Sequence, residues 1–355
     1  MKISHVVDSM EMGGAETLVM QMCRLQREQG HDPHIHAVAA LGSLGEQMQK
    51  EGYQVRSHVG AHLVDSARNF YRIFREERPD VVHLHNPTPT TYAAFPARMA
   101  GVRSIISTRH SLLAPPHSPM RELKYALACT SCNWVAGICD ATTHNLIELH
   151  TVPARKIVRI YNGAASLQRI PTERCPPKTG FTLLYVGRLA PIKNHDLLLQ
   201  AFHAALSAEP GLQLWMVGDG SQRRALENLA AHLGIAAHVT FWGQQIDVAP
   251  YFSAADVFIM SSKSEGLPIS ILQAFSLGLP AIVTDTGGMA EVVRFARAGI
   301  VVPLAGPSEM AEAIVRIARD KSERQELSVN AERAFRSHFT LQQMVDRYMS
   351  LYQNI

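Results

Sequence analysis

The sequence predicts an α/β protein built from two doubly wound domains that face each other across a central cleft. Three observations support this prediction. The 355 residues correspond to about two domains at roughly 150 residues per domain. Short apolar runs alternate with amphipathic stretches, as in parallel sheets covered by helices on both faces. A proline-rich stretch over residues 166–180 interrupts this alternation near the middle of the chain.

The first domain is expected to span residues 1–165. Apolar residues at Ala15, Leu18, Val19 and Met22 mark one face of its first helix, and Gly30 can end that helix. Its strands are expected at residues 2–7, 33–40, 53–59, 80–85, 102–108, 134–139 and 156–161.

The second domain is expected to span residues 181–339, after a linker over residues 166–180. From about residue 308 the chain has helical patterns to its end, and a last helix over about 340–355 can pack back on the first domain. The strands of this domain are expected at residues 181–188, 212–220, 238–243, 256–262, 280–285 and 299–303.

Charge and hydropathy exclude several classes of protein. With 34 basic and 31 acidic residues, the chain is too balanced to indicate a nucleic-acid partner. The N-terminus lacks the apolar region of a signal peptide. The longest uncharged stretch, residues 266–284, is interrupted by Pro268 and Pro280 and therefore indicates a helix, a turn and a strand. We expect a cytoplasmic protein, at most peripheral on the inner face of a membrane.

One stripe of basic residues bears on that membrane contact. Arg68, Arg72 and Arg75 share a helical face in the first domain and can contact anionic lipid weakly. An ordinary solvated helix face is the more common explanation of such a stripe.

No metal site is predicted. The five cysteines are an odd number, which favours free thiols, and the Cys129–Cys132 pair has no second pair at zinc spacing. We therefore expect these two residues to be small buried hydrophobes. His83 and His85 share one strand face, but no third ligand is apparent, so polar lining of a cleft is favoured over a metal pair.

The segment Glu265–Gly266–Leu267–Pro268 is the first candidate for chemistry. It follows an expected strand and leads into a helix that begins at about Pro268. The free N–H groups in the first turn of that helix can bind an anion or a sugar hydroxyl. Gln273 lies one to two turns into this helix. The alternative for Glu265 is a carboxylate that only stabilises the helix N-terminus.

Two cations follow Gly187, which ends another expected strand. Arg188 and Lys193 are five residues apart across a turn, and a fork-shaped donor beside a point charge suits a diphosphate. Two ordinary surface cations are the alternative explanation.

The first domain offers two further candidates. Gly13 and Gly14 precede its first helix and allow close approach of a phosphate, although a plain tight turn would look the same and the dinucleotide fingerprint is absent. His110 follows a strand, where it can bond a sugar hydroxyl or move a proton, or can simply be a loop histidine.

Taken together and in this order, these motifs resemble the retaining GT-B glycosyltransferases of glycosyltransferase family 4. The resemblance covers nearly the whole chain and rests on GGAE, DVVHLHNP, STRHS, IYNGA, VGRLAPIKN, MVGDG and EGLP. It implies the GT-B architecture of two Rossmann-like domains. It also implies that the N-terminal domain receives the acceptor and that the C-terminal domain binds a nucleotide-sugar.

The resemblance also implies residue roles. Arg188 and Lys193 look like the pair that holds the donor diphosphate, and Glu265 looks like the first glutamate of an E-x7-E motif, against the donor sugar. His110 resembles a histidine that contacts the transferred sugar. The catalytic candidates are Glu265, His110, Arg188 and Lys193. The donor-binding candidates are Gly14, Gly187, Arg188, Lys193, Gly266, Leu267, Pro268 and Gln273. The acceptor-side candidates are His85 and Asn162, the latter in an NG turn that ends the first domain.

One residue departs from the family pattern. The second glutamate of E-x7-E, which holds the ribose hydroxyls in the family, is replaced by Gln273. Glutamine can still accept a hydrogen bond but brings no charge, so ribose binding is expected to be weakened or retuned.

The resulting expectation is a metal-independent, retaining glycosyltransferase without a cofactor. Its donor is expected to be a UDP-sugar first and a GDP-sugar second. Its acceptor is a glycan, a lipid-linked or a small molecule, in the synthesis of bacterial cell-surface polysaccharide or lipopolysaccharide. The alternatives are a sugar-nucleotide epimerase on the same scaffold and a non-catalytic nucleotide-sugar-binding subunit, the latter supported only by Gln273.

Overall fold

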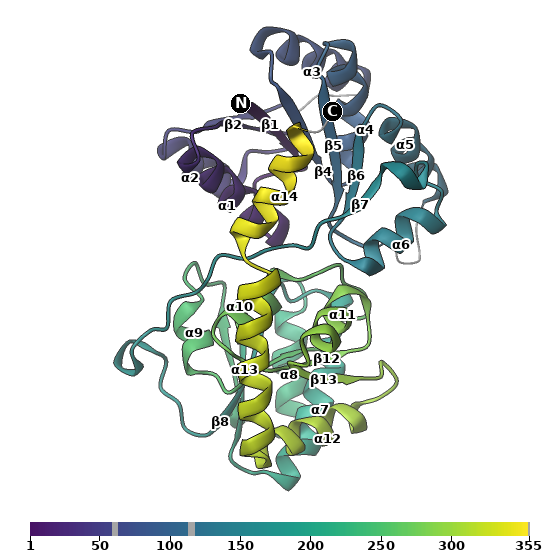
Figure 1. Ribbon diagram of the computed structural model, residues 1–355. Coiled ribbons are helices and arrows are strands. Elements are labelled where there is room, and N and C mark those ends of the chain that lie inside the picture. The colour runs from purple at the N-terminus through teal and green to yellow at the C-terminus, as the bar shows by residue number, and fades with distance from the viewer. Residues whose placement is uncertain (59–62, 113–117, 354–355) are drawn as a thin grey trace. The chain divides into compact units, whose positions relative to one another are not determined.

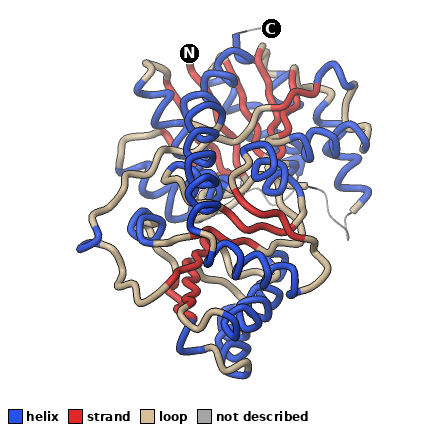
Figure 2. Tube along the Cα trace, turned by 60° about the horizontal axis from the view of Figure 1, so that its bottom comes forward, coloured by secondary structure: helices blue, strands red, loops and turns tan. Residues whose placement is uncertain are grey.

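The computed structural model describes residues 1–58, 63–112 and 118–353, and these form two compact units (Figure 1). Unit 1 comprises residues 1–163 and 341–355, and unit 2 comprises residues 164–340. Each unit contains a parallel sheet with helices on both faces (Figure 2). The last residue of the strand expected over 53–59, and residues 354 and 355 of the expected last helix, lie outside the described residues.

The sheet of unit 1 confirms the strands that the sequence predicts for the first half. Its order is β3-β2-β1-β4-β5-β6-β7, and every described pair is parallel. The order reverses between β1 and β4, and ligands of such sheets bind beyond the carboxyl ends of the strands at that position. The strands are β1 (Lys2–Val7), β2 (Asp32–Ala37), β3 (Gln54–Ser57), β4 (Val81–His85), β5 (Ser104–Arg109), β6 (Trp134–Gly137) and β7 (Ile157–Arg159).

Helices cover both faces of this sheet. Helix α1 lies beside α2 and α14, while α4 lies between α3 and α5 (Figure 1). The apolar residues Leu18, Val19 and Met22 of α1 are buried, and Gly30, with φ +80°, follows the end of the helix as expected. The helices are α1 (Gly14–Glu28), α2 (Gly42–Lys50), α3 (Leu63–Glu77), α4 (Pro87–Met99), α5 (Pro119–Cys129), α6 (Asp140–Glu148), the 3₁₀ turn η1 (Ala154–Lys156) and α14 (Leu341–Gln353).

The C-terminal helix α14 joins unit 1 through buried tyrosines. Tyr352 Oη lies 2.6 Å from Nδ1 of His83 on β4, and Tyr348 Oη lies 3.0 Å from Oγ1 of Thr108 on β5. These four side chains are buried, so the end of the chain completes the packing of the N-terminal sheet.

Unit 2 repeats the same design with six strands in the described region. Its order is β10-β9-β8-β11-β12-β13, which is the 3-2-1-4-5-6 order of a Rossmann sheet. The order reverses between β8 and β11. The strands, all predicted from the sequence, are β8 (Phe181–Val186), β9 (Leu212–Val217), β10 (Val239–Gly243), β11 (Val257–Met260), β12 (Ala281–Thr284) and β13 (Gly299–Val302).

The helices of unit 2 pack in two groups. Helix α7 lies against α12 and α8, and α13 lies against α10, with α11 beside it. The helix expected from about Pro268 begins one residue later, because Pro268 adopts an extended ψ of 135° as the N-cap of α10. The helices are α7 (His195–Ala208), α8 (Arg223–His232), α9 (Ala249–Ala254), α10 (Ile269–Ser276), α11 (Gly287–Ala296), α12 (Pro307–Arg319) and α13 (Lys321–His338), with 3₁₀ turns η2 (Thr172–Arg174), η3 (Pro191–Lys193) and η4 (Ala236–His238).

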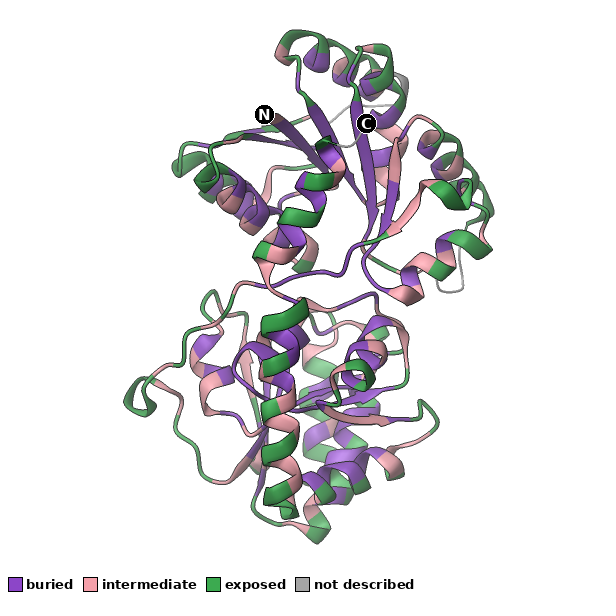
Figure 3. Ribbon diagram, in the orientation of Figure 1, coloured by how far each residue is buried: buried purple, intermediate pink, exposed green. Residues whose placement is uncertain are grey.

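The segment that joins the units is held by unit 2. The backbone N–H of Leu167 donates to Ser276 Oγ at 3.2 Å, and that of Ile170 donates to Ser253 Oγ at 2.9 Å. Its side chains are mostly exposed or half-buried (Figure 3). The segment therefore has little regular structure of its own but is not a free tether.

The cysteines and the lengths of the helices agree with the sequence-based predictions. All five cysteines are free, and Cys129 and Cys132 are buried beside the core of unit 1, as expected for small hydrophobic residues. Among the helices of the described residues, none is both long enough and apolar enough to cross a bilayer.

Candidate functional site

An ion pair lies where the strand order of unit 2 reverses. Lys193, in the turn η3 that follows β8, donates to Oε1 of Glu265, which follows β11. The two side chains are only 17% and 13% exposed. Because β8 and β11 are neighbours, the ion pair occupies the position where Rossmann sheets bind their ligands.

Main-chain anchors hold this pair in place. Ser261 Oγ, just after β11, lies 3.0 Å from the carbonyl oxygens of both Lys193 and Asn194. On the other side, Thr284 Oγ1 donates to the carbonyl oxygen of Ser262 at 2.7 Å. Asn194 has a φ of 55°, which closes the turn and begins α7. These bonds hold the loop that carries Lys193 next to the loop that leads to Glu265.

Close backbone packing places Arg188. A Cβ atom at Gly218, where φ is +132°, would lie 2.0 Å from the carbonyl oxygen of Gly187. The loops VGRL and VGDG therefore pack main chain against main chain, which only glycine permits here. Tyr185 Oη donates to the carbonyl oxygen of Arg188 at 3.1 Å, and the Arg188 side chain is exposed. Arg188 and Lys193 thus both follow β8.

Two titratable neighbours of the ion pair stay uncharged at neutral pH. Burial, and then the Glu265 carboxylate, raise the pKa of Tyr185 well above its ordinary value. Burial, and then the Lys193 charge, lower the pKa of His195 to about 4. Lys193, Glu265 and Arg188 therefore carry their charges beside two neutral rings.

Helix α10 provides the remaining donor-side candidates. Gly266, Leu267 and Pro268 lead into it, and the buried Leu267 side chain anchors this loop. Its first-turn amides have no partner within the helix and can bind an anion or a hydroxyl group. Gln273, the fifth residue of α10, is half-buried.

In unit 1, Gly14 is the first residue of α1, after β1. A Cβ atom at Gly14 would have no other atom within 4 Å, so the glycine leaves open space above the helix N-terminus. Such space allows the close approach of a phosphate group that the sequence predicts.

His110 follows β5 and is held at its backbone and its ring. Its N–H donates to Asn86 Oδ1 at 3.0 Å, and its ring Nε2 lies 3.0 Å from Nδ1 of His85. Burial lowers the pKa of His110 to about 4, so the imidazole is neutral at neutral pH. Its Nδ1 is buried and has no hydrogen-bond partner among the described residues.

Both acceptor-side candidates are buried. His85 is 2% exposed, and Asn162 is 4% exposed, with its N–H donating to the carbonyl oxygen of Ile138 at 3.3 Å. His85 lies between His110 and His5, which is on β1. In this structure, neither candidate is open to a bulky acceptor.

The expectation that His83 and His85 lack a third ligand is wrong. His5 lies opposite His83 in the register of β1 and β4, and one nitrogen of each of His5, His83 and His85 lies within 4.8 Å of the others. The alternation in KISHVV, which puts His5 and Val7 on one face, was the available signal. The ring nitrogens of His83 are already bonded, to Tyr352 Oη and to Thr108 Oγ1 at 2.7 Å.

A second cluster has a similar composition. His34 and His36 on β2 lie 3.1 and 3.3 Å from Oε2 of Glu77 at the end of α3. Arg56 on β3 lies 3.3 Å from the other oxygen of that carboxylate and neutralises it. Hydrogen bonds and ion pairs already occupy these groups, and both clusters belong to unit 1.

Comparison with protein families agrees with this geometry. Residues 12–165 match the family model described as Glycosyltransferase Family 4, and residues 180–320 match the model described as Glycosyl transferases group 1. One match falls on each unit.

Known relatives cover different shares of the chain. A lipopolysaccharide core biosynthesis glycosyltransferase, LpsE of Rhizobium meliloti, is 31% identical over 49% of this chain, which spans half of that relative's length. The UDP-Gal:alpha-D-GlcNAc-diphosphoundecaprenol alpha-1,3-galactosyltransferase of Escherichia coli is 25% identical over 80% of this chain and 78% of its own length.

Solved structures share the whole fold. HepE of Anabaena, in complex with UDP, superimposes with a TM-score of 0.86 at 18% identity over 100% of both chains. WaaG, a glycosyltransferase involved in lipopolysaccharide biosynthesis, superimposes with a TM-score of 0.76 at 16% identity over 99% of this chain and 100% of its own. With two Rossmann-like units and a family match on each, the chain belongs to the GT-B glycosyltransferases of glycosyltransferase family 4.

Proposed function

We propose that the chain is a retaining, metal-independent transferase that moves a sugar from a nucleotide donor to a glycan or lipid-linked acceptor. The observation that carries this proposal is the Lys193–Glu265 ion pair at the reversal point of the unit 2 sheet, beside Arg188. This arrangement offers two cations to a diphosphate and one carboxylate to the sugar bound to it.

The reaction follows from where charge develops. The bond between the anomeric carbon and the diphosphate oxygen breaks, so positive charge builds on the sugar and negative charge on the leaving group. Arg188, Lys193 and the first amides of α10 stabilise the negative charge. The acceptor oxygen bonds to the same face of the anomeric carbon, and its proton passes to the leaving diphosphate. Glu265, released from Lys193, can hold the sugar hydroxyls.

The donor is a UDP-sugar in this proposal, with a GDP-sugar second. HepE, which shares the fold, binds UDP, and the E. coli relative is named for UDP-Gal. Gln273 lies on α10, eight residues after Glu265, where it can accept hydrogen bonds from the ribose. Gly14 and His110 of unit 1 bind the phosphates and the transferred sugar.

The acceptor side is proposed from the relatives. LpsE is named for lipopolysaccharide core biosynthesis, and the E. coli relative for a diphosphoundecaprenol-linked sugar. We therefore propose a role in cell-surface polysaccharide or lipopolysaccharide synthesis, on the cytoplasmic side of a membrane.

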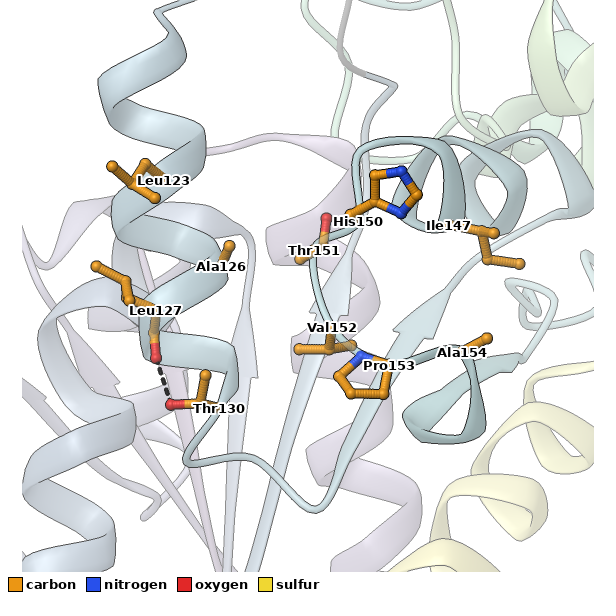
Figure 4. A pocket seen from close by; sticks show the side chains of 10 residues that line it. All are labelled: Leu123, Ala126, Leu127, Thr130, Ile147, His150, Thr151, Val152, Pro153 and Ala154. Carbon is orange, nitrogen blue, oxygen red and sulfur yellow. Dashed lines mark hydrogen bonds between the residues drawn. The ribbon is translucent and has the colours of Figure 1, made fainter.

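An exposed apolar surface on α5 supports that acceptor class. On α5, Met120, Leu123 and Leu127 are 54–62% exposed at a spacing that puts them on one face. Figure 4 shows Leu123 and Leu127 on the same helix, lining an apolar hollow of about 470 Å³ with Ile147 of α6 opposite.

Basic residues accompany this apolar surface. Arg121 and Lys124 are exposed on the same helix, so apolar and cationic side chains are available together to an anionic bilayer. We place the weak membrane contact here. The three arginines of α3 singled out in the sequence are also exposed, and Arg72 lies 3.9 Å from Glu76, which partly offsets its charge.

The anomeric configuration of the product tests the retaining step. Purified chain is incubated with UDP-[¹³C]glucose, UDP-[¹³C]galactose or UDP-[¹³C]GlcNAc and a bacterial lipid extract, and the product is examined by NMR. An α-linked product from these α-configured donors is expected, and a β-linked product would refute retention. An epimerase would convert the donor without the extract, and a binding subunit would leave it unchanged.

A further inference from the structure

Three buried side chains of unit 1 and the half-buried His110 form a continuous hydrogen-bonded relay that ends at His110. Gln26 Oε1, on α1, lies 2.8 Å from His5 Nε2; His5 Nδ1 lies 3.0 Å from His85 Nε2; and His85 Nδ1 lies 3.0 Å from His110 Nε2. Gln26 and His5 are 0% exposed. Every ring nitrogen along this path is used except Nδ1 of His110.

The sheet register explains why the relay reaches the carboxyl edge. His5 on β1 pairs with His83 on β4, and His85 lies two residues further along β4, on the same face of the sheet. His85 in turn pairs with Thr108 on β5, and His110 follows Thr108 by two residues, just beyond the end of that strand. The relay therefore crosses β1, β4 and β5 diagonally, from the buried centre of the sheet to its ligand-binding edge.

With the Gln26 amide oxygen facing His5, one set of tautomers satisfies every hydrogen bond of the relay. The Gln26 oxygen only accepts, so His5 must carry its proton on Nε2. A neutral imidazole has one N–H, so Nδ1 of His5 accepts from Nε2–H of His85, and Nδ1 of His85 accepts from Nε2–H of His110. The last nitrogen, Nδ1 of His110, is then left with a bare lone pair.

This logic requires uncharged rings, and burial provides them. Burial lowers the pKa of His5 and of His110 to about 4, and that of His85 well below its ordinary value. Near neutral pH each ring therefore has one donor and one acceptor nitrogen.

We propose that Gln26, His5 and His85 are positioning residues that hold His110 as the Nε2–H tautomer, so that its Nδ1 accepts a hydrogen bond from a hydroxyl of the transferred sugar. The proposal rests on the proposed function, in which His110 contacts that sugar. It explains a buried acceptor without a partner in the unliganded chain, since the partner would arrive with the substrate. It also gives His85 a supporting role beneath His110 in place of direct contact with the acceptor.

Long-range ¹H–¹⁵N spectra of the chain labelled with ¹⁵N-histidine test the tautomers directly, because protonated and bare ring nitrogens differ in chemical shift. At pH 7.5, His5, His85 and His110 are each expected to carry the proton on Nε2, with the His110 signals assigned by their loss in His110→Gln. A proton on Nδ1 of His110, or a mixture of tautomers, would overturn the proposal. This result is independent of any substrate.

Three variants separate positioning from packing. Gln26→Leu removes the terminal acceptor and should produce mixed tautomers at His110. Gln26→Glu puts a carboxylate against His5 and favours the charged ring, which donates from both nitrogens, so the His110 proton should move to Nδ1. Gln21→Leu, on the same helix but outside the relay, is the matched control and should change nothing. If Gln26→Leu does not fold, the wild-type spectra and Gln26→Glu still decide the question.

Turnover of UDP-glucose gives the catalytic readout. Gln26→Leu should lower kcat by about tenfold or more, because a His110 ring protonated on Nδ1 can no longer accept a hydrogen bond from the sugar hydroxyl. UDP binding should change little. Gln26→Glu should lower kcat in the same way, and an unchanged kcat in a Gln26→Leu variant with mixed tautomers would contradict the proposal. If the wild-type tautomers are as expected but no nucleotide-sugar is turned over, the proposed function fails while the relay stands.

Discussion

Lys193 and Glu265, 72 residues apart in sequence, form an ion pair at the carboxyl ends of neighbouring strands in the unliganded chain. A diphosphate would compete with Glu265 for Lys193, so donor binding would free the carboxylate as it captures the lysine. The charges of Lys193 and Glu265 thus depend on each other. Removing either side chain leaves the other charge half-buried and without its partner.

Removing either cation should slow transfer strongly. Arg188→Ala and Lys193→Ala are each expected to lower kcat by ~10²–10³-fold, the range for losing one donor that stabilises developing charge. The measurement is initial-rate release of UDP. Lys178→Ala is the control, because Lys178 also pairs with a carboxylate of unit 2, Asp256, at 2.6 Å. Near-wild-type rates in both site variants would remove the diphosphate assignment.

Gln273→Glu should bind UDP as tightly as the wild type or more tightly. A carboxylate forms hydrogen bonds to hydroxyl groups that are about twice as strong as those of a neutral oxygen. Calorimetric titration with UDP measures the change. A folded Gln273→Glu variant that binds about tenfold more weakly, a loss of about 1.4 kcal/mol, would show that Gln273 is an adapted contact with a different partner.

Catalysis should not require a divalent metal. Lys193 and Arg188 can neutralise a diphosphate at the proposed site, and the two candidate ligand clusters in the described residues belong to unit 1. UDP release should persist after dialysis against excess EDTA. If activity disappears and Mg²⁺ or Mn²⁺ restores it, the metal-independent mechanism is wrong.

Mild acid should destabilise the chain. The pKa of His5 is lowered in the folded state to about 4 from 6.5, so the unfolded chain binds the proton first as the pH falls. The stabilisation is complete above pH 6.5 and is lost as the pH falls towards 4. At pH 5 the loss is about 2 kcal/mol for one such group.

Thermal unfolding at pH 7.5 and pH 5.0 measures this loss. His144→Gln, a change at an exposed histidine of the same unit, should show the same fall in Tm as the wild type. Equal Tm values at the two pH values would mean that the buried histidines are not held neutral.

Membrane binding should depend on the apolar face of α5. Changing both Leu123 and Leu127 to glutamate removes two exposed apolar side chains, each worth about 1.5 kcal/mol or more when buried. Co-sedimentation with vesicles of phosphatidylglycerol and phosphatidylethanolamine should fall at least about tenfold. Val329→Glu, at an exposed apolar residue of unit 2, is the control. Unchanged binding in the double variant would place any membrane contact elsewhere.

Local sequence patterns predicted the strands and helices well, because their signals lie within each element. The two cations after Gly187 were also apparent from their spacing. The partnership of Lys193 with Glu265 was not, since it depends on β8 and β11 being neighbours.

His5 was missed for the same physical reason. Its alignment with His83 requires the register between β1 and β4, which are 78 residues apart at that position and carry no local signal for pairing. The relay from Gln26 to His110 likewise appears only once three strands and one helix are assembled.

Acceptor-dependent release of UDP tests the central claim most directly. The wild-type chain is mixed with UDP-sugars, with or without a diphosphoundecaprenol-linked sugar, and free UDP is measured over time. The glycosyltransferase account predicts that the acceptor increases UDP release from at least one donor and that Lys193→Ala abolishes the increase. UDP-sugars that remain intact with every acceptor, or that react equally well without one, would contradict it.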